Sequence, residues 1–337
     1  MSVGIDIGSK TIKVVELSWT GDVPSLKSAA VIGMKDASIE KMQDEVEFTN
    51  LASKIKKLFA DAKISSKEVY IGLPESQVFT RSIKFPPLTD QEIASAVKWQ
   101  AEEIVPIPIK EAIFQHIILE RRENTQPPEV LVLVVAAPRT LVEKYIKILS
   151  LAGLTVTGVE TELIALTRSL GVPAKTSLVV SLGAKSTDIA VAKNAKLVFS
   201  RTISTAGDAL TRIIAQTMGI DPAQAEEYKK TYGFSNQLEG KVANAITPVF
   251  KIIVEEIKKA INFYQTDEKG DAPSVIVLSG GSAGIPEIVP TLTKMIGIEV
   301  VMGNPFSKVT VDPQVLKNLK SYAPLYGVAV GLALKVG

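Results

Sequence analysis

Two short segments of this chain, more than 150 residues apart, combine glycine, hydroxyl and charged side chains in a way that suits anion binding. Residues 3–13 read VGIDIGSKTIK, and residues 178–189 read LVVSLGAKSTDI. In each segment a glycine and small hydroxyl residues separate two apolar runs. Glycine lets the backbone close on a phosphate because it has no Cβ, and the N–H groups of such a turn bind the anion. Two facing turns could clamp a nucleoside triphosphate with its Mg²⁺.

Short strands must position each of these turns, and three later segments offer further contacts. Residues 225–229 read AEEYK within a predicted helix, and residues 275–282 (VIVLSGGS) run from a strand into paired glycines. Residues 322–334 (YAPLYGVAVGLAL) are rich in small side chains, which allow a helix to pack closely against another element. The two hairpins would face each other from two lobes.

Composition excludes several classes of protein. The chain has 337 residues, which predicts two domains. A net charge of +2 argues against nucleic-acid binding, because it gives no basic face. The absence of cysteine excludes disulfides and thiol chemistry and is consistent with a cytoplasmic location. No apolar run approaches the roughly 20 residues of a membrane span, and the start shows no signal-peptide pattern, so we expect no direct membrane span.

An α+β module is expected within the first lobe. The segment TDQE at 89–92 is a capping box that opens a helix, and three apolar runs around this helix predict strands. Trp99, on the helix, and His116, in a strand, are expected to be packing residues. We expect three parts: a first lobe of residues 1–73 and 156–176, an inserted module of residues 74–155, and a second lobe of residues 177–337.

The five ordered segments resemble the actin-like ATPase superfamily. Residues 3–13 and 178–189 look like its phosphate-1 and phosphate-2 loops, and residues 225–229 look like the AExxK element that packs on the nucleoside. Residues 275–282 resemble the adenosine loop and residues 322–334 the second connecting helix. The resemblance implies an α/β fold with two lobes of RNase H-like topology, and ATP and Mg²⁺ as ligands.

Within this superfamily, the insert is similar to subdomain 1C of FtsA-type relatives. Its amino-acid sequence more closely resembles that of the PilM family of type IV pilus assembly proteins. The similar stretches are FPPLT at 85–89, AEEIVPIP at 101–108 and EEIKKAINFY at 255–264. FtsA proteins usually end in an amphipathic membrane helix, and this chain shows none after Lys335. The PilM resemblance implies a cytoplasmic scaffold, recruited to the inner face of the cytoplasmic membrane by the N-terminal peptide of a PilN-like membrane protein. Pilus assembly or retraction ATPases and a second copy of the chain are further candidate partners.

The resemblance assigns roles in the first hairpin. Asp6 stands where the superfamily holds Mg²⁺, usually through water, as suits a hard oxygen ligand. Gly8 with the loop tip Ser9, Lys10 and Thr11 would contact the β- and γ-phosphates. Lys13 matches a phosphate-contacting lysine. The alternatives are an aspartate that caps a turn and a lysine on a solvated strand face.

The second hairpin departs from the family pattern. Ser181 stands where relatives carry an aspartate that completes Mg²⁺ coordination, and a hydroxyl, which acts through a metal-bound water, brings no charge. Asp188 would orient a water molecule or merely cap the turn. The other predicted phosphate contacts are Gly183, Ser186, Thr187 and Gly207. We therefore expect slow ATP hydrolysis or none.

The remaining predicted site residues lie between the lobes and around the nucleoside. Glu160 is the best match to the carboxylate that positions the attacking water, and a general base must lie within hydrogen-bond reach of that water. Glu226 would bond the ribose. Glu256 and Lys259 are helical neighbours that lie near the adenine or form a solvated salt-bridge row. The remaining predicted nucleoside contacts are Lys229, Gly280, Gly281 and Ser282.

Three functions compete on this evidence. The first is a nucleotide-gated scaffold of the PilM type, and the second is a filament-forming, FtsA-like cell-division protein. The third is a sugar or acetate kinase, which would share both hairpins. A kinase needs an acceptor pocket with a base for its hydroxyl, and no corresponding motif is visible. The sequence therefore favours the scaffold.

Overall fold

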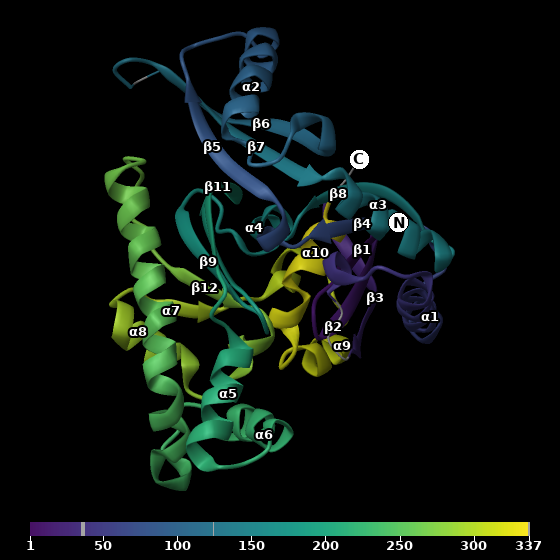
Figure 1. Ribbon diagram of the computed structural model, residues 1–337, viewed down its shortest axis with the longest axis vertical. Coiled ribbons are helices and arrows are strands. Elements are labelled where there is room, and N and C mark those ends of the chain that lie inside the picture. The colour runs from purple at the N-terminus through teal and green to yellow at the C-terminus, as the bar shows by residue number, and fades with distance from the viewer. Residues whose placement is uncertain (35–37, 124, 336–337) are drawn as a thin grey trace.

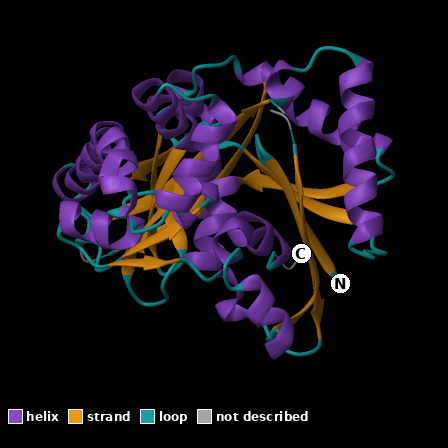
Figure 2. Ribbon diagram, turned by 90° about the horizontal axis from the view of Figure 1, so that it is seen from below, coloured by secondary structure: helices purple, strands orange, loops and turns teal. Residues whose placement is uncertain are grey.

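The computed structural model describes residues 1–34, 38–123 and 125–335, and it contains three β-sheets. Two five-stranded sheets form the cores of two lobes, and a three-stranded sheet lies at the top of Figure 1. Figure 2 shows the strands in the interior of the molecule and the helices on its outer faces. The strand orders are β3-β2-β1-β4-β8, β11-β10-β9-β12-β13 and β5-β7-β6.

The first sheet is built from apolar strands that are buried because helices cover them. Its core joins β1 and β4 to the inner faces of α1 and α3, with Ile5, Ile71, Ile55 and Ile148 fully buried. Asp44 caps α1 by accepting a hydrogen bond from the N–H of Glu47. The elements are β1 (Ser2–Ile7), β2 (Thr11–Trp19), β3 (Pro24–Gly33), α1 (Glu45–Asp61), β4 (Glu68–Leu73), α3 (Arg139–Leu151) and β8 (Thr155–Thr161).

The second sheet repeats the arrangement of a hairpin beside parallel strands. Strand β9 pairs antiparallel with β10 and parallel with β12. The long helix α7 crosses the outer face of the sheet and buries Phe250, Ile253 and Ile257 there. The elements are β9 (Thr176–Leu182), β10 (Thr187–Lys193), β11 (Lys196–Ile203), α5 (Gly207–Met218), α6 (Pro222–Tyr232), α7 (Lys241–Thr266), β12 (Ile276–Ser279), α8 (Ile288–Ile296) and β13 (Val300–Met302).

The insert is a three-stranded antiparallel sheet with one helix. Its elements are β5 (Phe79–Phe85), α2 (Asp90–Ile104), β6 (Ala112–Arg122) and β7 (Glu129–Pro138). The predicted capping box is present at Thr89 and Glu92. The predicted range 74–155 also includes α3, but α3 packs into the core of the first lobe. The packing therefore limits the insert to the segment from β5 to β7. Trp99 is 80% exposed on α2, so the expectation that it packs in a core is wrong.

Two helices join the lobes, and glycines let them touch. Helix α4 (Glu162–Leu170) follows β8 and leads into β9, and α10 (Gly327–Ala333) follows the short α9 (Pro313–Leu319). Both lie in the middle of Figure 1. A Cβ at Gly331 would lie 1.9 Å from the carbonyl oxygen of Ala165 on α4. A Cβ at Gly4 on β1 would lie 2.2 Å from the carbonyl oxygen of Ala329, so α10 is in backbone contact on two sides.

Among the described residues, no helix combines the length and the apolar character that crossing a bilayer requires.

We predict that Gly331→Ala destabilises the fold by about 2 kcal/mol, because the added methyl group must push α10 away from α4. Gly33→Ala is the matched control, since a Cβ there meets no atom within 4 Å. Urea unfolding of the two variants measures the difference. Equal free energies of unfolding for the two variants would contradict this packing.

Candidate functional site

The tips of the two hairpins face each other across the junction of the lobes. In each turn the glycine N–H donates across the turn at 3.0 Å, from Gly8 to the Thr11 carbonyl and from Gly183 to the Ser186 carbonyl. Lys10 Nζ, at the first tip, lies 3.0 Å from Asp208 Oδ1 at the start of α5 in the second lobe. In return, Lys185 Nζ of the second tip donates to Ser38 Oγ of the first lobe at 2.6 Å. The structure thus brings the two predicted phosphate loops together.

Asp6 and Lys13 form a buried ion pair at the base of the first hairpin. Lys13 Nζ lies 3.0 Å from Asp6 Oδ2, and the two residues are 8% and 5% exposed. They face each other in the β1–β2 register, and Lys13 therefore does not lie on a solvated strand face. A Cβ at Gly8 would lie 3.2 Å from Lys13 Nζ, so only glycine leaves the ammonium this space. A cation and an anion are thus paired directly under the turn.

In the second hairpin, Asp188 is buried and accepts two hydrogen bonds. Ser186 Oγ donates to it at 3.0 Å and Thr202 Oγ1 at 2.7 Å. Burial raises the pKa of the Asp188 carboxyl despite these bonds. Ser181 pairs with Asp188 in the β9–β10 register and with Ser279 on β12, so the three side chains lie on one face of the sheet. Thr187 Oγ1 donates to the Thr205 carbonyl at 2.7 Å and is not free for a ligand.

Gly207 lies where the second hairpin, α5 and the paired glycines converge. A Cβ at Gly207 would lie 2.3 Å from Ser282 Oγ and 3.0 Å from the Gly183 carbonyl oxygen. Ser282 Oγ itself donates to that carbonyl at 3.1 Å. Gly280 has a φ of +91°, and a Cβ there would lie 2.5 Å from the Leu182 carbonyl oxygen. Both features favour glycine. Backbone from three segments is therefore packed closely at one place.

Lys229 organises this region from below. Its ammonium, on a residue only 4% exposed, donates to the Gly207 carbonyl at 3.1 Å, to Thr211 Oγ1 at 2.8 Å and to Glu226 Oε2 at 2.6 Å. All three ammonium protons are thus used within the protein. Burial lowers the pKa of Lys229, while Glu226 opposes that shift. Lys229 therefore positions Gly207, and Glu226 keeps one face toward the cleft.

Glu160 and Glu162, two residues apart, have different surroundings. Glu160 receives two hydrogen bonds from Arg168, at 2.5 and 2.8 Å, and Arg168 also donates to the Gly331 carbonyl. This places Glu160 in an ion pair at the α4–α10 junction. Glu162 is the first residue of α4, and its nearest charged neighbours include Asp6, Asp188 and Lys13. Burial and then these carboxylates raise the pKa of Glu162 well above its ordinary value. Glu162 is therefore an acid that interacts with charged groups of both hairpins, and our sequence reasoning did not single it out.

Glu75 is a second buried acid that the sequence reasoning missed. It follows β4, is 7% exposed and accepts a hydrogen bond from Thr80 Oγ1 at 3.0 Å, while its Oε1 has no hydrogen-bond partner. Burial raises the pKa of Glu75 from 4.5 to about 7, and the charge of Asp188 adds to the shift. No motif marks this residue, because a glutamate after a strand and a proline is usually solvated.

Glu256 and Lys259 do not lie with the other predicted residues. They form an ion pair at 2.7 Å on α7, and Glu256 also pairs with Arg201 of β11. Arg201 lies opposite Ile189 in the β10–β11 register, and Ile189 packs into the core under α7. The contacts therefore fit the alternative of a salt-bridge row.

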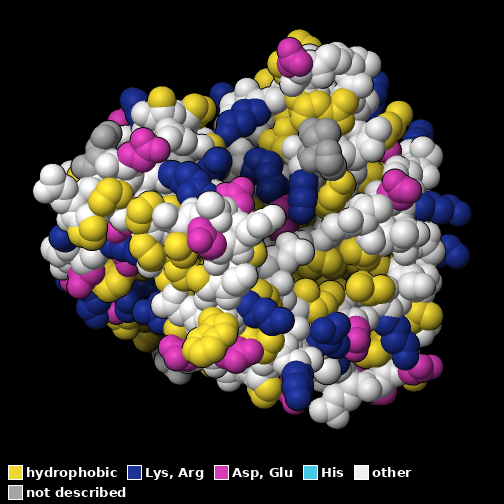
Figure 3. Space-filling view, turned by 90° about the horizontal axis from the view of Figure 1, so that it is seen from above, with side chains coloured by type: hydrophobic (Ala, Val, Ile, Leu, Met, Phe, Trp, Pro, Cys, Tyr) yellow, Lys and Arg dark blue, Asp and Glu magenta, His cyan; other side chains and the backbone are white. Residues whose placement is uncertain are grey.

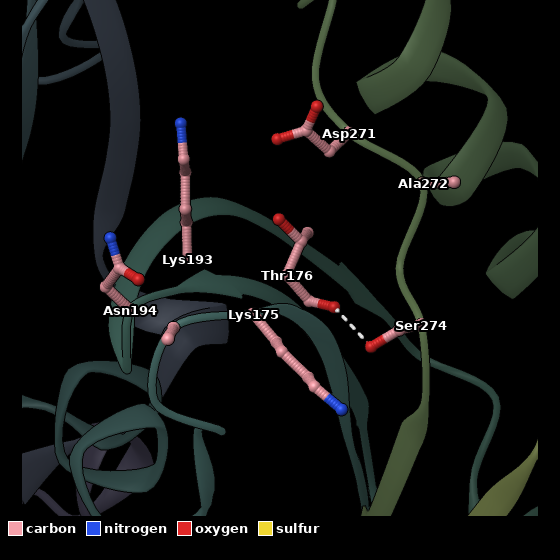
Figure 4. Close-up of a pocket in the computed structure, with 8 residues that line it drawn as sticks. Lys175, Thr176, Lys193, Asn194, Asp271, Ala272 and Ser274 are labelled. Carbon is pink, nitrogen blue, oxygen red and sulfur yellow. Dashed lines mark hydrogen bonds between the residues drawn. The ribbon is translucent and has the colours of Figure 1, made fainter.

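A cleft of about 740 Å³ opens beside the hairpin tips and is lined by Lys10, Asp208, Thr211, Arg212 and Glu226 among others. The lining joins Lys10 of the first hairpin tip to residues of α5 and α6, and its charged and hydroxyl side chains suit a polar, anionic ligand such as a nucleotide. Within the described ranges, no three histidine, aspartate or glutamate side chains group as a metal centre. A smaller depression of about 270 Å³ lies at the opposite end of β9 and β10 (Figure 4), where the Ser274 hydroxyl donates to the Thr176 carbonyl.

Glu75 makes stability depend on pH in a predictable direction. Its carboxyl binds a proton more tightly in the folded chain than in the unfolded chain, so its contribution is fully present below pH 4.5 and is lost as pH rises through about 7. We predict that Glu75→Gln stabilises the fold by about 3 kcal/mol at pH 8 and has little effect at pH 4.5.

Urea titrations at the two pH values measure this difference, and Glu103→Gln, at an exposed position on α2, is the control. An equal effect of Glu75→Gln at both pH values would show that Glu75 is not buried as an acid.

The fold is shared with solved structures of actin-like proteins. The chain is similar to a protein in a structure described as "PilM-PilN type IV pilus biogenesis complex", with a TM-score of 0.84, 29% identity, and coverage of 99% of this chain and 97% of that one. MreB5 of Spiroplasma citri bound to ADP matches with a TM-score of 0.53 and 14% identity over 98% of this chain and 94% of that one. The expected actin-like ATPase fold is thereby confirmed.

The amino-acid sequence is also similar to those of FtsA cell-division proteins. FtsA of Streptococcus pneumoniae serotype 2 is 25% identical over 343 residues, which cover 88% of this chain and 74% of that protein. The model of the family "Type IV pilus assembly protein PilM" matches residues 4–336. Because that match spans nearly the whole chain, the protein belongs to the PilM family of type IV pilus assembly proteins.

Proposed function

We propose that this protein is an ATP-binding scaffold of a type IV pilus assembly platform that holds a peptide of a PilN-like membrane protein. The observation that carries the proposal is that both hairpin tips make contacts across the junction of the lobes, while Gly207 and Ser282 pack on the Gly183 carbonyl of the second turn. A related MreB5 is described with bound ADP, and the related PilM is described in complex with PilN. These descriptions support the same two ligand classes for this chain.

In this proposal the turns at Gly8 and Gly183 bind the phosphates, with Ser9, Lys10 and Ser186 at the tips. The base lies on the bare backbone at Gly280 and Gly281. Asp6 and Ser181 hold Mg²⁺ through water, and the metal supplies charge neutralisation of the phosphates. Lys13 already neutralises Asp6 and therefore sets the charge that remains for the metal.

The proposed hydrolysis is slow. Glu162 takes the role that the sequence assigned to Glu160, because Glu162 lies among the charges of both hairpins and Glu160 is held by Arg168. The raised pKa of Glu162 lowers the share of its carboxylate form, which is the form that accepts a proton from water. With Ser181 in place of a charged group, the metal is also held less tightly. The site is therefore better suited to binding ATP than to cleaving it.

The partner peptide is proposed to bind between the insert and the first lobe. Strand β8 is the edge of the first sheet, so it can pair with an added strand. Partly buried apolar side chains beside it come from both parts: Val78, Ile113, Val156 and Val159. Figure 3 shows hydrophobic side chains around a hollow on the face that carries the insert, with lysine and arginine side chains along one side. Such a surface suits an extended peptide with alternate apolar side chains.

The same proposal places the protein on the cytoplasmic side of the inner membrane, where its partner recruits it. Pilus assembly or retraction ATPases and a second copy of the chain are further proposed contacts. The FtsA-like alternative shares the fold and differs in the partner.

We predict that the wild-type protein binds Mg²⁺–ATP and that Asp6→Asn weakens this binding at least tenfold, because it removes the carboxylate proposed to hold Mg²⁺. Asp61→Asn, at the exposed end of α1, is the control. Isothermal titration calorimetry with and without Mg²⁺ measures both. No heat of binding at millimolar nucleotide would refute the proposed ATP site.

Glu162→Gln should reduce single-turnover ATP hydrolysis by about 100-fold while ATP affinity changes less than threefold, as expected for loss of a proton-transfer group. The matched variant Glu160→Gln removes a carboxylate two residues away and should leave hydrolysis within threefold. If Glu160→Gln has the larger effect on turnover, the assignment of the two residues is reversed.

A fluorescein-labelled N-terminal peptide of a PilN-like protein should bind with an affinity that Ile113→Glu lowers at least tenfold, because a buried charge would face the apolar groove. Val31→Glu, on the opposite edge strand β3, should not change the affinity. Fluorescence anisotropy reports both. Equal affinities for the two variants would move the peptide site elsewhere.

A further inference from the structure

The insert sheet is buried on both faces, and the two faces belong to different bodies. Val130, Val132 and Val134 of β7 pack with α2 inside the insert. Leu131 and Leu133, which alternate with them, pack into the core clusters of the second lobe. Because side chains alternate along a strand, the odd-numbered face of β7 rests on the second lobe at Leu131 and Leu133. This explains why residues 130–137 read as a continuous apolar run.

Polar contacts close the edges of this interface. Ser82 Oγ of β5 donates to the Val198 carbonyl of β11 at 2.5 Å. Lys84 Nζ lies 3.0 Å from Glu268 Oε2, just beyond α7. The insert therefore contacts the second lobe at Ser82 and Lys84 of β5.

A third contact lies at the other edge of the insert sheet. Lys193, on the wall of the small depression in Figure 4, points away from Lys175. Its Nζ lies 3.1 and 3.3 Å from the two oxygens of Glu120 on β6. Arg122 holds Glu120 in place at 2.9 Å and is itself held by Glu129 at 2.8 Å. The ion pairs flank the buried leucines, so water is excluded from the centre of the interface.

The contacts of the insert with the first lobe are fewer and less buried. Ala137 is the buried insert residue in the first-lobe core, where Val78 and Ile113 are partly buried neighbours. The chain enters the insert after Pro74 and leaves it at Pro138, and each of these prolines precedes a new element. The insert is thus covalently part of the first lobe and packed as part of the second.

We infer that the insert moves with the second lobe as one body, so that any movement of the lobes changes the width of the groove between the insert and the first lobe. This inference rests on the proposed function, because it names how the nucleotide would regulate the peptide site. ATP at the hairpins acts on the lobes, and the insert carries the change to the groove. The strands β5 to β7 are the mechanical link.

Electron–electron double resonance, which measures the distance between two spin labels, tests the inference directly. Because the chain has no cysteine, labels can be attached at introduced cysteines alone. The labels are placed in pairs at three exposed positions. These are Trp99→Cys on α2, Val46→Cys on α1 and Ile252→Cys on α7, where the native residues are 80%, 69% and 53% exposed. On addition of Mg²⁺–ATP, the 99–252 distance should stay constant. The 99–46 and 46–252 distances should each shift by more than about 2 Å, as in a domain rearrangement.

Each other outcome contradicts the inference in a recognisable way. A shift in 99–252 with a constant 99–46 distance means that the insert moves with the first lobe. Three constant distances in a protein whose ATP binding is confirmed by calorimetry mean that no lobe movement reaches the groove. Absence of ATP binding refutes the proposed function itself.

A double variant, Lys84→Ala with Glu120→Gln, loosens the insert from the second lobe without touching either ligand site. ATP should change the peptide affinity of the wild-type protein at least about fivefold, within the usual range of coupling between two sites, and that of the variant less than twofold. Glu103→Gln with Lys110→Ala, at exposed positions of the insert, is the matched control. Coupling that persists in the folded double variant would overturn the inference.

Discussion

The backbone contact between α4, α10 and β1 is the constraint on which the rest of the structure depends. Gly331 lies against the Ala165 carbonyl, and Gly4 lies against the Ala329 carbonyl, at distances that no side chain permits. Helix α4 starts at the end of β8 and leads directly into β9, so its position fixes where both hairpins point. A wider crossing would separate the phosphate turns, and the contacts of Lys10 and Lys185 across the lobes would be lost.

Charge is the second organising feature of the cleft. Four acidic residues interact electrostatically with one another: Asp6, Glu75, Glu162 and Asp188. Lys13 is the basic residue that pairs with Asp6. Desolvation raises the pKa values of Glu75, Glu162 and Asp188, and repulsion from neighbouring carboxylates adds to the shifts of Glu75 and Glu162. A bound cation would relieve this repulsion, and a triphosphate without its cation would increase it. These charges therefore favour the proposed metal–nucleotide complex over a nucleotide without its cation, and the raised pKa values would disfavour proton abstraction there.

The sequence predicted the parts of the site that depend on local backbone, because glycine and hydroxyl residues at a strand turn have few alternative uses. The hairpins, the capping box at Thr89 and the small residues of α10 are all found as expected. The sequence could not distinguish Glu160 from Glu162 as the glutamate near the hairpin charges, because the distinction depends on where β8 ends and α4 begins. Arg201, which draws Glu256 into a salt-bridge row, is 55 residues away in sequence. The burial of β7 on both faces could not be predicted either, because an apolar run does not show which parts of the molecule cover each face of the strand.

A crystal structure with Mg²⁺ and a non-hydrolysable ATP analogue tests the central claim most directly. The account predicts the triphosphate between the turns at Gly8 and Gly183, the base on the backbone at Gly280–Ser282, and Glu162, not Glu160, facing the γ-phosphate. A nucleotide bound elsewhere, or a cleft that stays empty at saturating analogue, would contradict it.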